Sequence, residues 1–407
     1  MKKNALIICA HDGFTTHYCG VGTVVRKTLD SLKILLMRRS ALIDFELHFI
    51  TPWVDRNSGY FDTKNFKKVK TLANVTGGAL HEIRVIKREK NADINTNWGI
   101  DQWHRAAQQA ADIIKKMDHE KVIFFAHDIF FGLICYLVPR SEGVAGCFIP
   151  HSTGILFKEN FRLPTEKKIF LGINKNNYKI GYLNEFMKDH LQKDYHIKTK
   201  QLVSIKNALL IDESEDKQRK ISLQKSGVYK GKKLILSFGR CSAQKGYHIL
   251  IEAFKKSKLY GENYQLVLLA PTDITEGAYI KKLDSLLEMV PKEKVIWIKK
   301  FMPPRPFLVV NNLEAIVFAS LFECAPLAPL EALRNAPNAK IIYSDIEPFQ
   351  EIFLNLAGTH AVVRGSIGNL IKKLDSIPFE KTPQRSIILE SYENNFINCI
   401  SQLSGNI

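Results

Sequence analysis

The sequence predicts an α/β protein made of two doubly wound parallel sheets. Short apolar runs of strand length alternate with longer amphipathic runs of helical length, and this alternation restarts near residue 232. Alternating strands and helices favour parallel sheets covered by helices on both faces. Residues 211–232 between the two series are polar and charged, as linkers often are. The length of 407 residues also exceeds one core of ordinary size.

Ten apolar runs have the length and bounds of buried strands. The first half holds runs at residues 5–10, 45–51, 122–126, 146–150 and 178–183, and the second at 234–238, 265–270, 295–298, 315–319 and 340–343. The run at 5–10 follows two lysines, as in a signal peptide, but it is too short for a signal core and is interpreted as the first buried strand. Helical spacing of apolar residues occurs at 22–36, 102–116, 247–256, 280–289, 329–334 and 385–403.

We therefore expect an N-terminal domain over residues 1–210, a linker over 211–232 and a C-terminal domain over 233–384. In open α/β sheets, ligands bind beyond the carboxyl ends of the strands. The residues that follow each predicted strand are therefore the first candidates for a functional site.

Composition and charge limit the classes of function. The net charge of +17 favours anionic partners, such as phosphates or an acidic membrane surface. The lysine pairs are scattered and have no interleaved arginines and aromatics, so nucleic acid is not expected. The seven cysteines include no Cys-x-x-Cys pair, which indicates free thiols in a reducing, cytoplasmic compartment rather than disulfides or a zinc site.

The first strand of the N-terminal half, at 5–10, is followed by Asp12 and a loop that contains Gly20 and Gly22, with a helix expected from Val24. A glycine pair before a helix lets the backbone approach an anion, although many such turns are only structural. Val25 stands where a Gly-x-Gly-x-x-Gly fingerprint needs its third glycine, so an NAD enzyme is not expected.

Two later strands of the same half each end at a histidine. His127 follows the run at 122–126, and His151 follows the run at 146–150. Two histidines at successive strand ends suggest a shared site, whereas either one alone would suit a hydrogen-bonded core residue.

In the C-terminal half, the strand at 234–238 leads to a loop that contains Arg240 and Lys245, ahead of the helix at 247–256. Two cations beside a helix N-terminus suit a diphosphate, although a solvated basic loop would look the same in sequence.

The strand at 315–319 leads to Glu323 and, eight residues later, Glu331 on the first turn of the next helix. Carboxylates accept paired hydrogen bonds from neighbouring sugar hydroxyls, so this segment predicts binding of a sugar and a ribose. Glu331 alone would be explained by the helix dipole, which is worth about 0.3–1 kcal/mol.

Taken together, these motifs resemble the retaining GT-B glycosyltransferases, a clan that includes sucrose-phosphate synthase and many bacterial mannosyl- and glucosyltransferases. Gly239-Arg240 with Lys245-Gly246 resembles the family's donor-phosphate loop, and Glu323-x7-Glu331 its Glu-x7-Glu signature. The likeness extends more weakly through the first half, at Gly20–Arg26 and His151-Ser152.

The resemblance implies the GT-B fold, with two Rossmann-like domains facing a cleft. The first would lie on the acceptor side and the second would bind the nucleotide-sugar, while residues 385–407 would form a helix that crosses back to the first. Implied roles are charge neutralisation by Arg240 and Lys245, ribose binding by Glu331, donor-sugar binding by Glu323, a place for His151 beside that sugar, and one for Gly22 facing a phosphate or the acceptor.

The sequence departs from the family pattern at several positions. Ala325-Pro326 replaces the usual Phe-Gly, and since proline has no N–H, one amide contact to the diphosphate is lost. The amides of Leu327 and Ala328 remain as expected donor contacts.

We therefore expect a glycosyltransferase that moves a sugar from a UDP- or GDP-linked donor to a hydroxyl acceptor with retention. No cofactor is expected, and no metal, because the sequence has no Asp-x-Asp. The first alternative is a catalytically inactive GT-B protein that binds nucleotide or a partner enzyme, and the second is a nucleotide-sugar epimerase.

The acceptor, which is expected to be a saccharide, a cyclitol-type molecule or a lipid-linked hydroxyl, would meet loops near Asp12, Trp53 and His127. The run 24–39 is basic and leucine-rich, which suits either core packing or peripheral contact with an anionic membrane at its inner face.

Overall fold

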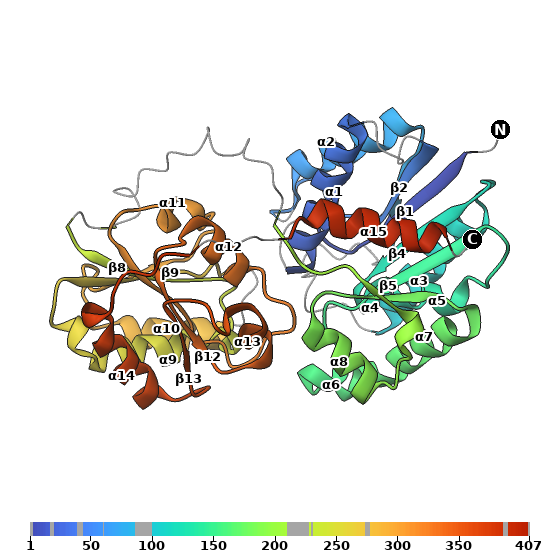
Figure 1. The fold of residues 1–407 in the computed structure, drawn as a ribbon. Coiled ribbons are helices and arrows are strands. Elements are labelled where there is room, and N and C mark those ends of the chain that lie inside the picture. The colour runs from blue at the N-terminus through green and yellow to red at the C-terminus, as the bar shows by residue number, and fades with distance from the viewer. Residues whose placement is uncertain are drawn as a thin grey trace. The chain divides into compact units, whose positions relative to one another are not determined.

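The computed structural model describes residues 3–16, 20–38, 44–59, 61–85, 100–209, 228, 231–272, 277–385 and 390–405. The chain divides into two compact units, Met1–Leu210 with Glu390–Ile407, and Ile211–Leu389. They are called unit 1 and unit 2 below. Most of the predicted linker, residues 211–232, lies outside the described residues. Figure 1 labels many of the elements of both units.

The described part of unit 1 contains a seven-stranded sheet in the order β3-β2-β1-β4-β5-β6-β7, and every ladder in it is parallel. The strands are β1 Asn4–Cys9, β2 Phe45–Pro52, β3 Leu80–Ile83, β4 Val122–His127, β5 Val144–Ile149, β6 Lys179–Tyr182 and β7 Leu202–Ser204. The order reverses direction after β1, so the carboxyl ends of β1, β4 and β5 adjoin at a topological switch point.

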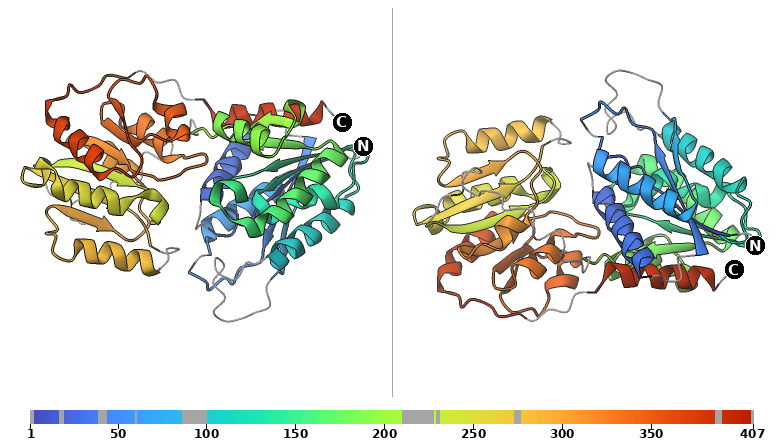
Figure 2. Two further views of the ribbon diagram at one scale, coloured as in Figure 1. Left: turned by 90° about the horizontal axis from the view of Figure 1, so that it is seen from below. Right: turned by 90° about the horizontal axis from the view of Figure 1, so that it is seen from above.

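Helices cover both faces of this sheet (Figure 2). They are α1 Gly20–Met37, α2 Thr63–Thr76, α3 Ile100–Lys115, α4 Asp128–Gly132, α5 Ile134–Leu137, α6 Gly154–Phe157, α7 Leu163–Asn176, α8 Glu185–Asp194 and α15 Tyr392–Ser404. The central strands have almost no exposed side chains, so their apolar runs are continuous and do not alternate with polar residues.

Helix α1 begins earlier than the sequence analysis expected. It starts at Gly20, so Gly20 and Gly22 lie in its first turn and not in a loop that ends at Val24. Glycine is a poor helix former, which is why the sequence placed the start too late. Leu29, Leu32 and Leu35 of α1 are buried in the core. Lys27 of the same helix is buried as well and donates a hydrogen bond to the Ala208 carbonyl at 3.0 Å.

The C-terminal helix α15 packs onto unit 1 beside α1, as Figure 1 shows. The Phe396 ring contacts Phe125 of β4, with centroids 5.3 Å apart, and the Tyr392 and Thr28 hydroxyls are 2.9 Å apart. Helix α15, although it follows unit 2 in the sequence, thus contributes side chains to the core of unit 1.

Unit 2 contains a six-stranded sheet in its described part, in the order β10-β9-β8-β11-β12-β13, again with parallel ladders. The strands are β8 Lys233–Phe238, β9 Tyr264–Leu269, β10 Val295–Ile298, β11 Leu313–Phe318, β12 Lys340–Ser344 and β13 Thr359–Val362. The helices are α9 Tyr247–Lys256, α10 Gly277–Leu287, α11 Arg305–Leu308, α12 Ala328–Asn335, α13 Glu347–Phe353 and α14 Ile367–Ser376.

Two hydrophobic clusters fill the two faces of the unit 2 sheet. Side chains of α9, α10 and α14 pack on one face, and those of α11, α12 and α13 on the other. The prediction of two doubly wound parallel sheets is confirmed. None of the helices in the described part of the chain has the length and apolar character that crossing a membrane requires. The six cysteines that the structure describes are buried free thiols, as predicted.

Candidate functional site

The candidate site residues of unit 2 lie on two loops at the carboxyl edge of its sheet. Strands β8 and β11 are parallel neighbours, paired at Leu236 and Ile316. The β8–α9 loop and the β11–α12 loop therefore emerge side by side. Arg240 and Lys245 belong to the first loop, and Glu323 belongs to the second.

The β8–α9 loop ends in a turn that needs glycine. Gly246 has φ +67° and is the residue before α9. A Cβ at this position would lie 2.0 Å from the Ala319 carbonyl oxygen, which follows β11. The absence of a side chain thus lets the two loops pack against each other, and it fixes the position of the preceding Lys245.

Lys245 and Glu323 form an ion pair between the two loops. The Lys245 Nζ and the Glu323 Oε1 are 2.5 Å apart, and the Ser320 hydroxyl donates to the same oxygen at 2.8 Å. Glu323 and Ser320 are buried, and Lys245 is partly buried. A charge-assisted bond in such surroundings is strong and geometrically specific. The structure therefore brings together two residues for which the sequence predicted separate roles.

Gln244 adds two further bonds between the loops. Its side-chain amide donates to the backbone carbonyl of Phe322 at 2.7 Å. The backbone carbonyl of Gln244 accepts a hydrogen bond from the backbone amide of Leu321 at 2.7 Å. Arg240 is exposed, and its guanidinium donates a hydrogen bond to the Gln244 side chain at 3.4 Å. Lys245 is thus held in place by the fold, while the Arg240 guanidinium extends into solvent from the same loop.

Helix α12 follows Glu323 and has Glu331 in its first turn, as predicted. Leu327 is its N-cap residue, and Ala328 is its first helical residue. The amides at a helix start lack intrahelical acceptors, which makes them suitable donors to an anion. Pro329 removes one more of these amides, in addition to the loss at Pro326 that the sequence analysis noted.

In unit 1, His127 and His151 come together at the carboxyl edge. Strand β4 ends at His127, which pairs in register with Ile149 of β5, and His151 lies two residues beyond. The His127 Nδ1 and the His151 Nε2 are 3.0 Å apart, and the rings stack with centroids 5.3 Å apart. His127 is completely buried, whereas His151 is partly exposed. His151 is therefore the accessible member of the pair.

Burial keeps these imidazoles neutral. It lowers the pKa of His151 to about 4, against an opposing effect of Asp128, and it lowers the pKa of His127 well below its ordinary value. The pKa of His11, which stacks on Phe130 nearby, is also lowered by burial. At neutral pH these rings can exchange hydrogen bonds but add no positive charge.

Asp12 lies three residues after the end of β1, in contact with helix α1. Its carboxylate accepts from the Gly13 amide at 2.9 Å and from the Thr16 hydroxyl at 2.7 Å, and the residue is fully buried. A Cβ on Gly22 would lie 2.1 Å from the Asp12 Oδ2. Gly22 therefore makes room for a buried carboxylate, which is a structural reason for this glycine that the sequence analysis did not anticipate.

Trp53 follows β2 at the same edge, one strand away from β1. Its backbone amide donates to the Ile83 carbonyl at 2.8 Å, and the Arg84 guanidinium lies 5.8 Å from the ring centroid. The Trp53 side chain is partly exposed.

The sequence analysis missed a buried charged network that supports the loop after β5. Arg162 donates to the Ser152 hydroxyl at 3.0 Å and to the Ser152 carbonyl at 3.1 Å. Glu166 accepts from the Gly154 amide at 2.8 Å and lies 3.4 Å from the Arg162 Nε. Both charged residues are buried. An Arg and a Glu four residues apart are common on exposed helix faces, so no sequence signal set this pair apart.

The same arginine also connects the loops of the two histidines. Its Nη2 lies 3.8 Å from the carboxylate of Asp128, the residue after His127, which has a left-handed backbone with φ +59°. Strained backbone at a strand end is frequent at functional sites. Arg162 is thus expected to orient His151 without itself needing to contact a ligand.

Comparison with known proteins bears on the family of part of the chain and on the fold. Residues 218–388 match the family model of glycosyl transferases group 1. No curated protein matches the sequence significantly.

Several solved structures have a similar fold over almost the whole chain. Sucrose-phosphate synthase from Thermosynechococcus elongatus is 13% identical with a TM-score of 0.65, covering 98% of this chain and 95% of that one. A glycosyltransferase from Rickettsia africae is 16% identical with a TM-score of 0.63, covering 100% and 95%. HepE from Anabaena, solved in complex with UDP-glucose, is 12% identical with a TM-score of 0.63, covering 98% and 99%.

Residues 218–388 thus match the model of glycosyl transferases group 1, and the two units of the chain have the fold of GT-B glycosyltransferases.

Proposed function

We propose that this protein transfers a sugar from a nucleoside-diphosphate sugar to a hydroxyl acceptor, with retention at the anomeric carbon. The observation that supports the proposal most is the Lys245–Glu323 pair at 2.5 Å, because it places a cation and a sugar-binding carboxylate together beside the start of α12. This edge combines the chemical groups that a phosphorylated sugar needs.

The diphosphate is proposed to bind Lys245, Arg240 and the first amides of α12. Negative charge grows on the diphosphate as its bond to the anomeric carbon breaks, and preorganised cations stabilise that charge. Lys245 is held by Glu323 before the donor binds, so little reorganisation is needed. Arg240 is exposed and is proposed to contact a phosphate when the donor arrives.

The sugars are proposed to bind the two glutamates. The carboxylate of Glu323, oriented by Ser320 and Lys245, accepts hydrogen bonds from hydroxyls of the transferred sugar. Glu331, one turn into α12, accepts from the ribose, while the amides of Leu327 and Ala328 face the diphosphate.

Retention is proposed from the resemblance of the Arg240/Lys245 loop and the Glu323-x7-Glu331 segment to the retaining GT-B glycosyltransferases. Because none of the residues described above is an obvious covalent nucleophile, we propose a displacement on one face of the sugar. In the proposed step, the acceptor oxygen bonds to the anomeric carbon from the face that the diphosphate leaves. The acceptor proton passes to the leaving phosphate oxygen. His151 is proposed to contact the sugar as a neutral imidazole, which matches its lowered pKa of about 4.

UDP is the first nucleotide to test. HepE was solved with UDP-glucose, and a protein of similar fold from E. coli was solved with UDP-2-fluoro glucose. The acceptor is proposed to approach the loops of Trp53 and of the His127–His151 pair. Asp12 and His127 are fully buried and are therefore proposed to position these loops, not to touch the acceptor.

A thermal-shift screen of nucleotides and nucleotide-sugars tests the donor proposal. A nucleoside diphosphate that binds the folded chain raises its melting temperature. Acceptors are then screened with the best donor, and proton NMR of the product reports the anomeric configuration. An inverted product would exclude retention. A melting temperature that no nucleotide or nucleotide-sugar raises would exclude the proposal itself.

An inactive nucleotide-binding GT-B protein is the second candidate. Pro326 and Pro329 favour it, because they remove two amides from the start of α12 where a diphosphate is expected. Transfer or donor hydrolysis by the purified chain alone would exclude this reading.

Peripheral contact with an anionic membrane stays a prediction. Leu29, Leu32 and Leu35 of α1 are buried, so exposed basic residues such as Lys33 of α1 and Arg38 just after it are the groups proposed for such a contact. Liposome sedimentation with and without anionic lipid tests it.

A further inference from the structure

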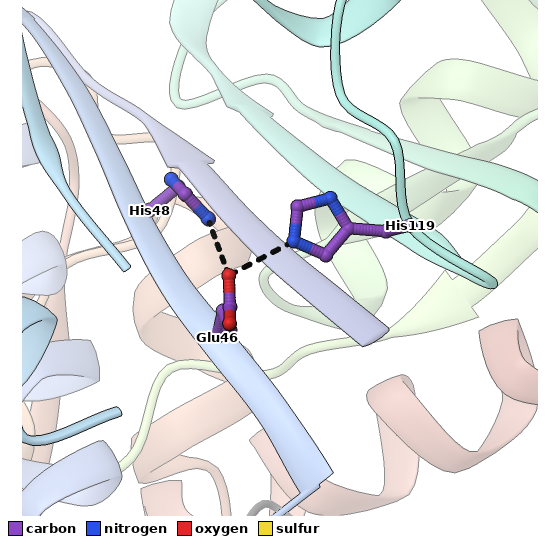
Figure 3. A group of neighbouring side chains, drawn as sticks. All are labelled: Glu46, His48 and His119. Atoms are coloured by element: carbon purple, nitrogen blue, oxygen red, sulfur yellow. Dashed lines mark hydrogen bonds and ion pairs between the residues drawn. The ribbon is translucent and has the colours of Figure 1, made fainter. Parts of the chain in front are cut away.

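A cluster of histidines and one glutamate lies at the opposite edge of the unit 1 sheet. Glu46 and His48 belong to the first half of β2, and His119 lies in the connector between α3 and β4. Because the candidate site occupies the carboxyl ends of these parallel strands, this cluster at the amino end is separate from it. Figure 3 shows both imidazoles directed at one carboxylate oxygen.

The three ligand atoms have the spacing of a metal site. The Glu46 Oε2 is 3.0 Å from the His119 Nε2 and 3.8 Å from the His48 Nε2, and all three atoms lie within 4.8 Å of one another. Ligand atoms about 3.3 Å apart surround a tetrahedral zinc ion with bonds of about 2.0–2.1 Å. The observed distances bracket that value, so small side-chain rotations suffice.

A fourth histidine orients one of the ligands. The His48 Nδ1 and the His81 Nε2 are 3.1 Å apart, and His81 belongs to the neighbouring strand β3 on the same face. When His48 donates this bond, its Nε2 bears a lone pair directed into the cluster. Metal-bound histidines usually donate their second ring N–H to such a partner.

That Nε2 atom is buried without a hydrogen-bond partner among the described residues. His48 itself is only 8% exposed. A buried polar atom without a partner costs free energy, and a metal ion would remove that cost. The observation is independent of the ligand spacing, and it points to something bound between the three residues.

The charges around the cluster are compatible with a divalent cation. Lys3 contacts the other carboxylate oxygen, Oε1, at 3.3 Å and is 61% exposed, so it can turn toward solvent. We propose that Glu46, His48 and His119 bind a zinc ion that fastens the start of β2 to the α3–β4 connector. Two histidines and a glutamate form a recognised zinc ligand set that leaves a fourth position for water.

The proposal is independent of the proposed sugar transfer and concerns binding and stability. Zinc is titrated by calorimetry into the full chain without an affinity tag, after treatment with a chelator. We expect about one zinc ion per chain and a higher melting temperature with zinc. Cobalt then serves as a spectroscopic probe, and its visible absorption should indicate a four-coordinate site.

Variants assign the ion to this cluster. Glu46→Gln and His119→Gln should each lower zinc affinity by more than the about 10- to 100-fold expected for His81→Gln, which removes only the outer partner. Glu46→Gln preserves the shape of the side chain, so circular dichroism should remain that of the wild type. His104→Gln, outside the cluster and bonded to Thr165 at 3.2 Å, is the matched control and should bind as the wild type does.

Two results would overturn the proposal. One is a wild-type chain that takes up no zinc. The other is zinc binding that Glu46→Gln and His119→Gln leave unchanged, which would place the ion elsewhere in the chain.

Discussion

Lys245 and Glu323 are 78 positions apart in the sequence, and their side chains meet at 2.5 Å where two neighbouring parallel strands end. The pair joins a loop with the features of a phosphate site to a loop with those of a sugar site. Neither residue is predicted from sequence to contact the other, because both roles were assigned toward a ligand. The contact means that the proposed donor site is also a stabilising contact between the two loops.

Replacing the lysine of this pair should destabilise the fold. Lys245→Met leaves a buried carboxylate without its cation, which costs about 3 kcal/mol of unfolding free energy. Adding Glu323→Gln to that variant should recover part of the loss, since no unpaired charge then remains buried. Urea denaturation measures both effects.

The exposed pair Lys193–Asp189 supplies the control, with side chains 76% and 57% exposed. Lys193→Met should cost less than about 1 kcal/mol. Equal losses for Lys245→Met and Lys193→Met would contradict the burial argument.

Gly246→Ala should be severely destabilising. The new Cβ would lie 2.0 Å from the Ala319 carbonyl oxygen, in a backbone conformation with φ +67° that alanine adopts poorly. Gly368→Ala near the start of α14 meets no atom within 4 Å and should raise stability by about 0.5–1 kcal/mol. Thermal melts compare the two variants. If Gly246→Ala melted at the wild-type temperature, the two loops would not pack as described.

Two glycines in the first turn of α1 should respond oppositely to alanine. Gly22→Ala places a methyl group 2.1 Å from the buried Asp12 carboxylate, so it should lower stability and displace Asp12. Gly20→Ala meets nothing within 4 Å and should be neutral or mildly stabilising. Equal stability of the two variants, measured by denaturation, would show that Asp12 does not occupy the space beside Gly22.

Stability should fall on acidification because of the buried histidines. An unfolded histidine binds a proton near pH 6.5, whereas His151 in the folded chain has a pKa of about 4. Its contribution is therefore complete above pH 6.5 and is lost as the pH falls toward 4, by at most about 1.4 kcal/mol per pH unit. Urea denaturation between pH 7 and pH 5 measures this slope.

His151→Gln should flatten the slope, since it removes one of the groups that protonate only on unfolding. The control is His196→Asn, at an exposed position with φ +54° that asparagine tolerates. It should retain the wild-type dependence on pH. A slope unchanged in His151→Gln would mean that His151 titrates normally in the folded chain.

Most of the fold could be predicted because the central strands are continuous apolar runs. The strands that sequence analysis missed are β3, β7 and β13, and each lies at the outer edge of its sheet. β3 and β13 are half-exposed, so they lack the apolar run that marks a buried strand. β10, also an edge strand, was found because its sequence Val-Ile-Trp-Ile is apolar throughout.

The candidate site could be predicted only as positions along the chain. Parallel strands place their following residues at one edge, which is why His127, His151 and Lys245 were identified. The contacts across that edge depend on strand order and side-chain rotamers, and neither can be derived from a single sequence. The cluster of Glu46, His48 and His119 was missed for the same reason, since a Glu-x-His on a strand places both side chains on one face but does not reveal the third residue.

Release of nucleoside diphosphate from UDP- and GDP-sugars by the purified chain, with and without acceptor, tests the central claim most directly. The wild type should release it, and Arg240→Ala should lower turnover by orders of magnitude while circular dichroism shows a preserved fold. Lys245→Ala should lower turnover as much, measured at a temperature where circular dichroism shows that this less stable variant is still folded. Full activity in both variants, or no release from any donor by the wild type, would contradict the account.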